Sequence, residues 1–179
     1  MNLKPTLLAL AAAASFVSSA QAAIFTTTGT LSNTDPTFNR PFEDLSGLSA
    51  VGNAVRYDVL NFVVGTSGNY TFLTTAMFDS FSLLYSPTFT AAAPLTNARA
   101  ANDDLLGLTT SGFDFDLTAG TNYFLVTTSF SNGELGAYST TIGGPGVITV
   151  VPEAGTYGMM ALGLAVLGIA RRRATSRAA

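Results

Sequence analysis

The sequence predicts an all-β fold, a two-sheet sandwich, set between two apolar ends that are not part of it. The middle of the chain is rich in Thr, Phe, Tyr and Val and is interrupted at short intervals by Gly, Asn, Asp and Ser, which is typical of many short strands. No segment shows a convincing helical period. The chain has 179 residues, and because a domain takes roughly 100 to 200, we expect one domain with appendages.

Residues 1–22 have the three-part pattern of a secretory signal peptide. Lys4 supplies the positive start, an apolar run follows over residues 6–14, and small residues close the segment at Ala20 and Ala22. The run is too short for a permanent anchor, and the small residues fit signal peptidase. We therefore expect cleavage after Ala22. The alternative, a buried N-terminal helix, is disfavoured because nothing amphipathic breaks the run.

The first half of the expected sandwich contains four strands. Residues 24–31 are expected to form an edge strand, followed by a loop. Residues 55–64 begin by alternating apolar and charged side chains, which predicts a strand with one solvent-exposed face. Residues 66–69 have turn chemistry. Two further strands are expected over residues 70–75 and 81–85.

The second half begins with a long loop over residues 86–112, which contains one short strand. Residues 112–117 alternate again, and residues 123–130 form the strongest strand signal of the chain. Residues 131–134 predict a hairpin that pairs this strand with the next one, residues 136–142.

The C-terminal end has the pattern of a single transmembrane helix. Nothing charged lies between Glu153 and Arg171, and a helix over about 155–170 would be near 24 Å long, slightly short of the ~30 Å hydrocarbon core. The three arginines Arg171, Arg172 and Arg173 can snorkel, and by the positive-inside tendency they stay cytoplasmic. The part before Pro152 would then lie outside the inner membrane. A core helix is the alternative, but a core helix should be amphipathic.

This tail, residues 151–179, resembles the PEP-CTERM sorting signal of Gram-negative bacteria, in which a motif, an apolar helix and an arginine cluster follow in this order. Over the motif at 151–154, Val151, Pro152 and Glu153 match, and Ala154 stands where a second proline is usual. In that family a membrane-embedded exosortase recognises the motif, removes the tail and releases the protein. The resemblance implies transient inner-membrane anchoring, then the cell envelope, cell surface or extracellular matrix.

Composition excludes several functions for the part between the ends, residues 23–150. The chain has no His and no Cys, so ordinary zinc or copper sites and Ser/His/Asp or Cys/His triads cannot be built. Residues 23–150 keep three basic and ten acidic residues, a net charge of about −7. Nucleic acid would be repelled by this charge. Without disulfides, stability must come from burial.

Residues 55–142 resemble bacterial pre-peptidase C-terminal domains and related jelly-roll modules. The resemblance implies a jelly-roll-like β-sandwich, an accessory module for binding or folding without catalysis of its own. It rests on the order of five short pieces, residues 68–72, 79–85, 102–104, 117–126 and 136–139.

Five aspartates could hold a metal ion. Carboxylates from loops suit calcium, which tolerates irregular sets of oxygen ligands, and the candidates are Asp79, Asp103, Asp104, Asp114 and Asp116. Asp114 and Asp116 are two apart, so on a strand they share one face. The alternative, which we favour, is a solvated face with acids in Asx-type turns. Apart from calcium, no cofactor is expected.

Two catalytic or sugar-binding alternatives remain. A pair of carboxylates can catalyse glycoside hydrolysis, but a jelly roll of this size leaves little room for a deep cleft. Tyrosines could form a sugar-stacking platform, although their strand positions favour core packing; they are Tyr57, Tyr70, Tyr85, Tyr123 and Tyr138. We expect an exported, non-enzymatic protein with a structural or adhesive role. The alternatives are a calcium- or polysaccharide-binding module, including an ice-binding-like surface protein with exopolysaccharide among its partners, and thirdly a glycoside hydrolase.

Overall fold

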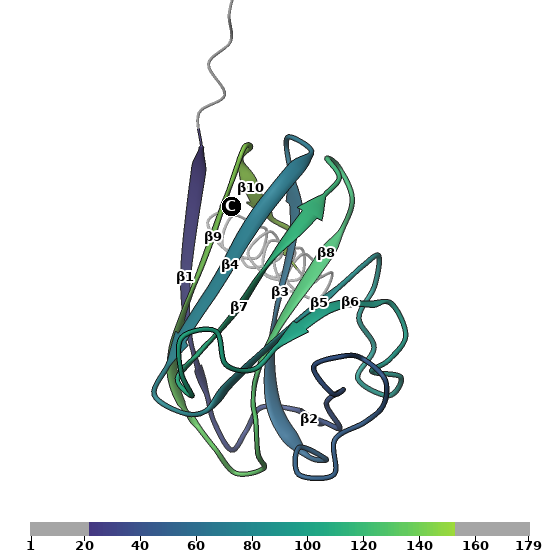
Figure 1. Ribbon diagram of the computed structural model, residues 1–179, viewed down its shortest axis with the longest axis vertical. Helices are drawn as coiled ribbons and strands as arrows, with labels where there is room; N and C mark the ends of the chain where they lie inside the picture. Colours follow the sequence, from purple (N-terminus) through teal and green to yellow (C-terminus); the bar gives the residue numbers. More distant parts are fainter. Residues whose placement is uncertain (1–21, 153–179) are drawn as a thin grey trace, which may run out of the picture.

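The structure is a computed structural model that describes residues 22–152, and in this range it is an all-β sandwich (Figure 1). Its ten strands are β1 (Ala23–Leu31), β2 (Thr37–Phe38), β3 (Val55–Val64), β4 (Gly68–Ala76), β5 (Ser80–Tyr85), β6 (Ala98–Asn102), β7 (Thr110–Leu117), β8 (Tyr123–Ser129), β9 (Gly136–Gly144) and β10 (Ile148–Val150).

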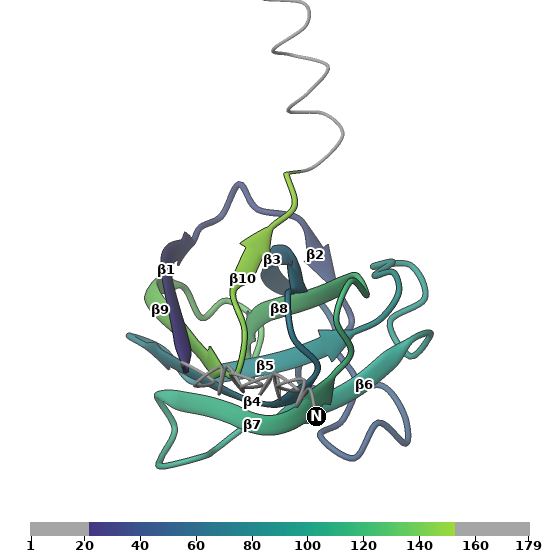
Figure 2. The ribbon, with the colours of Figure 1, turned by 90° about the horizontal axis from the view of Figure 1, so that it is seen from above.

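The strands form two antiparallel sheets packed face to face (Figure 2). The first sheet has the order β1-β9-β4-β7, and the second has the order β10-β3-β8-β5-β6 with β2 paired to β3. The chain changes sheet at most of its connections, as from β3 to β4 to β5 and from β6 to β7 to β8 to β9. The predicted all-β sandwich is confirmed, and this crossing pattern is the one expected of a jelly-roll-like module.

Most of the predicted strands lie where the pattern placed them. The strand over 55–64 is β3, the edge strand over 24–31 is β1, and the long loop holds the short strand β6. The predicted hairpin over residues 131–134 is wrong: β8 pairs with β3 and β5, while β9 pairs with β1 and β4. Both edges of β8 are occupied, so β9 cannot pair with it, and the chain instead crosses to the other sheet. A turn signal shows that the chain reverses, but not which sheet accepts it.

The space between the two sheets is filled by apolar side chains at one end. The fully or nearly fully buried members of this inner core are Phe62, Val64, Tyr70, Phe72, Leu84, Leu117, Tyr123, Leu125, Ile142 and Ile148. Tyr70 lies against Gly144, where an added Cβ would come within 2.1 Å of its ring. Its hydroxyl donates to the Thr66 carbonyl at 2.8 Å, which satisfies the one polar atom of the side chain.

The other end of the inter-sheet space is lined by hydroxyl groups. Thr74 and Thr140 are joined at 2.8 Å, and Ser82 lies 3.1 Å from Thr74 and 2.7 Å from Ser111. Ser80 donates to Ser111 at 3.1 Å. These side chains are buried, and because each hydroxyl finds another, burial costs little.

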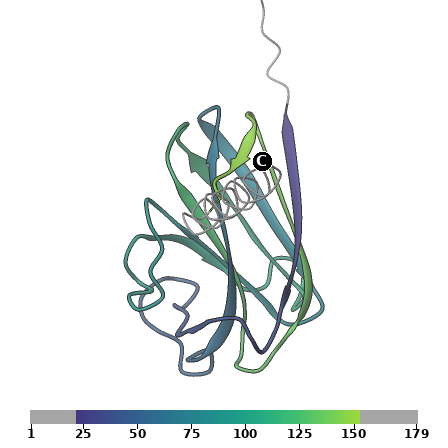
Figure 3. The ribbon, with the colours of Figure 1, turned by 180° about the vertical axis from the view of Figure 1, so that it is seen from behind.

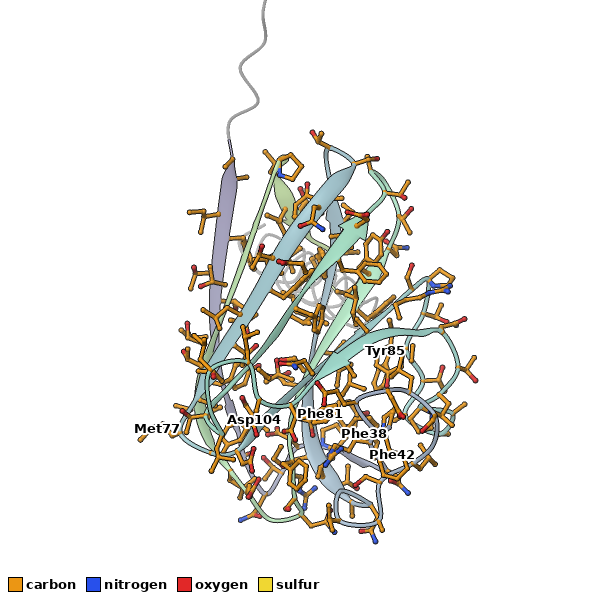
Figure 4. The ribbon with its side chains drawn as sticks, viewed as in Figure 1. Phe38, Phe42, Met77, Phe81, Tyr85 and Asp104 are labelled. Atoms are coloured by element: carbon orange, nitrogen blue, oxygen red, sulfur yellow. The ribbon has the colours of Figure 1, made fainter. Side chains whose placement is uncertain are left out.

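A second apolar core covers the outer face of the second sheet. Its buried residues are Phe38, Val55, Phe81, Leu83, Tyr85 and Val126, with Phe89 packed against them. All six residues of β5 are buried: Phe81, Leu83 and Tyr85 in this second core, Leu84 in the inner core, and Ser80 and Ser82 at the hydroxyl-lined end. The cover comes from the segments around β2 and before β6, where Phe38 and Phe89 approach at 5.8 Å between ring centroids. Figure 4 shows Phe38 and Tyr85 on this side.

Candidate functional site

Three carboxylates meet where β5 begins and β6 ends. Asp79 immediately precedes β5, and Asp103 and Asp104 immediately follow β6. Because these strands are antiparallel neighbours, the start of one lies beside the end of the other. One carboxylate oxygen from each residue lies within 4.8 Å of the others, and Asp79 and Asp103 are half-buried. Asp104, labelled in Figure 4, is exposed. We call these three residues the acidic cluster.

Arg40 lies beside the acidic cluster and is buried. Its guanidinium carbon is 4.2 Å from the ring centroid of Phe81 and 4.5 Å from that of Phe130. Its Nε donates to the Phe130 carbonyl at 2.9 Å, and its Nη1 donates to the Pro41 carbonyl at 3.1 Å. Gly52 makes room for it, since a Cβ there would lie 2.6 Å from Nε. Burial lowers the pKa of Arg40, and nearby carboxylates, Asp103 foremost, oppose that shift.

The acidic cluster is electrostatically crowded. Burial raises the pKa of Asp103 to about 6, and the carboxylates of Asp79 and Asp104 add to the shift while Arg40 opposes it. Burial also raises the pKa of Asp79, with the Glu134 carboxylate as the next cause. Asp103 therefore keeps its proton to an unusually high pH for an aspartate.

Two oxygens of the acidic cluster lack hydrogen-bond partners among the described residues. They are Oδ1 of Asp79 and Oδ1 of Asp103, both inaccessible to solvent. A hollow of about 310 Å³ is lined by Asp103, Arg40, Glu43 and Ser49 together with apolar residues. Asn102 links this wall to the sheet: its amide donates to Glu43 at 2.8 Å and its carbonyl oxygen accepts from the Gly112 backbone at 2.8 Å.

This arrangement offers two chemical states. Hard, partly buried carboxylate oxygens without donors suit a calcium ion, which takes about six to eight oxygen ligands from irregular loops. The same oxygens can instead share a proton on Asp103, with Arg40 balancing part of the remaining charge. The carboxylate oxygens fit calcium as ligands. The positive charge of the nearby Arg40 guanidinium, in contrast, weakens the binding of any cation.

Asp114 and Asp116 do not belong to the acidic cluster. Both are exposed on β7, and Asp116 accepts a hydrogen bond from the Asn69 side chain at 3.0 Å. Strand alternation turns them to solvent and turns Phe113 and Phe115 toward the inner core. The solvated-face interpretation therefore describes this pair.

Three charged residues around the acidic cluster, Arg40, Glu43 and Glu134, were not predicted as site residues. Arg40 and Glu43 come from the loop after β2, and Glu134 from the turn before β9, so all are far in sequence from Asp103. The sequence does contain one feature that could have indicated Arg40. It is one of only three basic residues between the two ends, and aromatic residues lie close to it on both sides.

A second hollow, a groove of about 420 Å³, lies over β3. It is lined by Asp35, Tyr57, Asp58, Phe89 and Phe124 among others. Both carboxylates already have structural partners: Asp35 accepts from the Ser32 backbone at 2.6 Å, and Asp58 accepts from the Tyr138 hydroxyl at 2.7 Å. Burial raises the pKa of Tyr138. The groove thus combines aromatic walls with fixed acceptors, which suits binding better than acid–base catalysis.

The five tyrosines do not form one platform. Three of them, Tyr70, Tyr85 and Tyr123, are buried, whereas Tyr57 and Tyr138 are half-buried. Core packing is therefore the main role of these side chains.

The sorting motif begins where the sandwich ends. The Val151 backbone N–H donates to the Asn61 carbonyl at 2.8 Å, and Pro152 after it is exposed. Glu153, Ala154, the helix expected over 155–170, the three arginines and Ala20 lie outside the described residues. Across residues 22–152, no helix is long and apolar enough to span a membrane.

The chain is similar to several solved structures at low sequence identity. A search of curated proteins gave no match. The pre-peptidase C-terminal domain of a collagenase from Bacillus anthracis is similar in structure, with 17% sequence identity and a TM-score of 0.43 over 66% of this chain and 87% of that one. PliG from Aeromonas hydrophila, a periplasmic lysozyme inhibitor of g-type lysozyme, has 13% identity and a TM-score of 0.36 over 72% and 86%.

The tail gives a match of a different kind. The model of the PEP-CTERM protein-sorting motif matches residues 150–174, which confirms the resemblance found in the sequence. Such a motif indicates an exported protein that is sorted by exosortase. The chain thus combines an all-β sandwich over its described residues with a PEP-CTERM protein-sorting motif that begins at the end of β10.

Proposed function

We propose that this protein is a non-catalytic structural or adhesive component of the cell envelope or extracellular matrix. Signal peptidase cleaves after Ala22, the helix over 155–170 holds the chain in the inner membrane with Arg171–Arg173 in the cytoplasm, and exosortase then removes the tail. The observation that carries the proposal is the motif match at residues 150–174.

The position of the motif supports this order of events. Pro152 is exposed and lies two residues beyond β10, so an enzyme can reach the motif while the sandwich stays folded. Among residues 22–152 the last strand pairing of β10 is Val150 with Phe62, so cleavage beyond the motif leaves the described strand pairings intact.

Fractionation of the host with motif variants tests the proposal. Pro152→Ala combined with Glu153→Ala should leave the uncleaved chain in the inner membrane, while Thr149→Ala, an exposed change just before the motif, should leave release unchanged. Ala154→Pro, which restores the usual proline, should raise the released fraction. Equal release of all variants would contradict sorting by this motif.

A second candidate function is calcium binding by the acidic cluster, favoured by the two carboxylate oxygens that lack partners. At a calcium concentration 100 times the Kd, binding would stabilise the fold by about 2.7 kcal/mol. The melting temperature of the purified protein should then rise with millimolar calcium, and Asp79→Asn with Asp103→Asn should abolish the rise.

The matched control for calcium is Asp114→Asn with Asp116→Asn, which removes the same charge from a solvated face. A calcium response that persists in the cluster variant, or that is absent from the parent protein, would end this candidate.

Polysaccharide binding is the other role of this class, and the aromatic groove over β3 supports it. A glycan array with the parent protein and with Phe89→Ala would test that role.

A further inference from the structure

Strand β1 forms an exposed edge that carries no protection against pairing. Its nine residues, Ala23–Leu31, pair with β9 along their whole length, and no strand within residues 22–152 lies on the other side (Figure 3). In a strand paired on one side only, every second residue directs its N–H and C=O away from the sheet. Such a row is a template for another strand.

The other edges of the two sheets are protected. At the far edge of the first sheet, β7 carries Asp114 and Asp116, both exposed. In the second sheet, β6 has only five residues and carries Arg99, and β10 has only three residues. Short length and charge are the usual means of preventing edge pairing. β1 has neither a charged residue nor a proline, and it is among the longest strands.

The edge is held in an extended form. Gly29 lies under the ring of Tyr138 from β9, and a Cβ at Gly29 would come within 2.3 Å of the tyrosine hydroxyl oxygen. That hydroxyl donates to Asp58 on β3 in the opposite sheet. A large aromatic ring over an edge glycine fixes the register of the strand. The edge therefore needs little ordering before it binds.

We propose that β1 pairs antiparallel with β1 of a second copy of this chain, so that the two first sheets join into one continuous sheet. Each copy carries a net charge of about −7 over residues 23–150, which opposes association, so two copies can meet only where no charged side chains face each other. β1 meets this condition, because none of its nine residues is charged and self-pairing places no like charges opposite one another. Antiparallel self-pairing is a two-fold contact that closes on itself.

The side chains along the joint support the same arrangement. Thr26, Thr28 and Thr30 lie on the exposed face of β1, and Thr26 already bonds to Thr141 of β9 through their hydroxyls at 3.1 Å. Threonine pairs across neighbouring strands stabilise antiparallel sheets, so the same pairing can repeat across the new joint. The inference does not depend on how the tail is processed.

Single-cysteine scanning tests the pairing, and the natural absence of cysteine removes any background. Each of residues 24–30 is replaced in turn by cysteine in the full-length chain in its host, and covalent dimer is measured under oxidising conditions. A disulfide needs Cα atoms about 4.4–6.8 Å apart, so only the residue at the two-fold axis reaches its own copy. We expect dimer to peak at one position and to fall on both sides.

Thr75→Cys is the matched control, because Thr75 is exposed on β4 in the interior of the same sheet. The peak position should give at least about tenfold more dimer than Thr75→Cys, since Cα atoms of residues away from the axis lie beyond disulfide range. A lysine two residues from the peak position should abolish the dimer, and Thr75→Lys should not.

Three results would overturn the proposal. The first is that no position of β1 gives covalent dimer although the protein remains resistant to protease. The second is that Thr75→Cys and the β1 variants give equal amounts of covalent dimer. The third is that β1 cross-links to a different protein. The last result would show that the edge serves a different partner.

Discussion

The outer faces of the two sheets differ in what lies on them. The first sheet follows the usual alternation, with the inner core on one side and exposed threonines such as Thr28 and Thr75 on the other. The second sheet is buried on both sides, because the segments around β2 and before β6 pack a second core onto its outer face. The segments with the weakest sequence pattern thus cover the smaller of the two apolar cores.

The difference also locates the candidate sites. The acidic cluster and its hollow lie at the margin where the covering segment that contains Arg40 and Glu43 meets β5 and β6. The aromatic groove lies along the same cover, over β3. The first sheet also has a hollow, of about 300 Å³, over β4 and β9, but no carboxylate lines it. The unprotected edge of that sheet is a second feature through which it could interact.

The largest effect is expected from removing the cover. Phe38→Ala deletes a ring that is 4% exposed and that contacts Tyr57 and Phe89, and it should lower the free energy of unfolding by about 3–5 kcal/mol. Phe42→Ala, in the same loop but 44% exposed, should cost far less. Denaturant unfolding measures both, and equal costs would show that the second core is not a packed core.

A smaller effect separates the two sides of one strand in the first sheet. Thr140→Val leaves the buried hydroxyl of Thr74 without its 2.8 Å partner and should cost about 1–3 kcal/mol. Thr141→Val, the next residue on the solvent side, should change the free energy of unfolding by less than about 0.5 kcal/mol. A reversed order would show that β9 is turned the other way.

The smallest effect is a pH dependence at the acidic cluster. The pKa of Asp103 is raised from 3.8 to about 6, so the folded state binds the proton more tightly than the unfolded chain. Stability therefore falls as pH rises from about 4 to about 6 and is constant above that range. Asp103→Asn should be more stable than the parent at pH 7, by no more than about 1 kcal/mol because solvent screens a half-buried group.

The gain from Asp103→Asn should disappear below pH 4, where the parent is protonated in both states. Melting curves at pH 4 and pH 7 without calcium measure it, with Asp114→Asn as the control on the solvated face. A gain that is the same at both pH values would contradict the assigned cause.

Local pattern predicted the strands but not their partners. Alternation over residues 55–64 and the edge position of residues 24–31 could be inferred because each depends on the strand's own side chains. The partner of β9 could not, since it depends on which strand edges remain free after distant segments have paired. The tail was predictable for a similar reason: its motif is read as a local sequence.

The acidic cluster was only half predictable. The carboxylates of Asp103 and Asp104 form a visible pair in the sequence, and Asp79 joins them because β5 and β6 are neighbours. Nothing local shows that Arg40 stacks between Phe81 and Phe130, because that contact joins residues from three separate segments. Charge balance in the site is therefore a tertiary property.

The intact mass of the protein recovered from the host's surface fraction tests directly whether the chain is exported and its tail removed. We predict a polypeptide that begins just after Ala22 and ends near Glu153, with the sandwich complete and the arginine-ended tail gone. A full-length chain found only in the cytosol would contradict it.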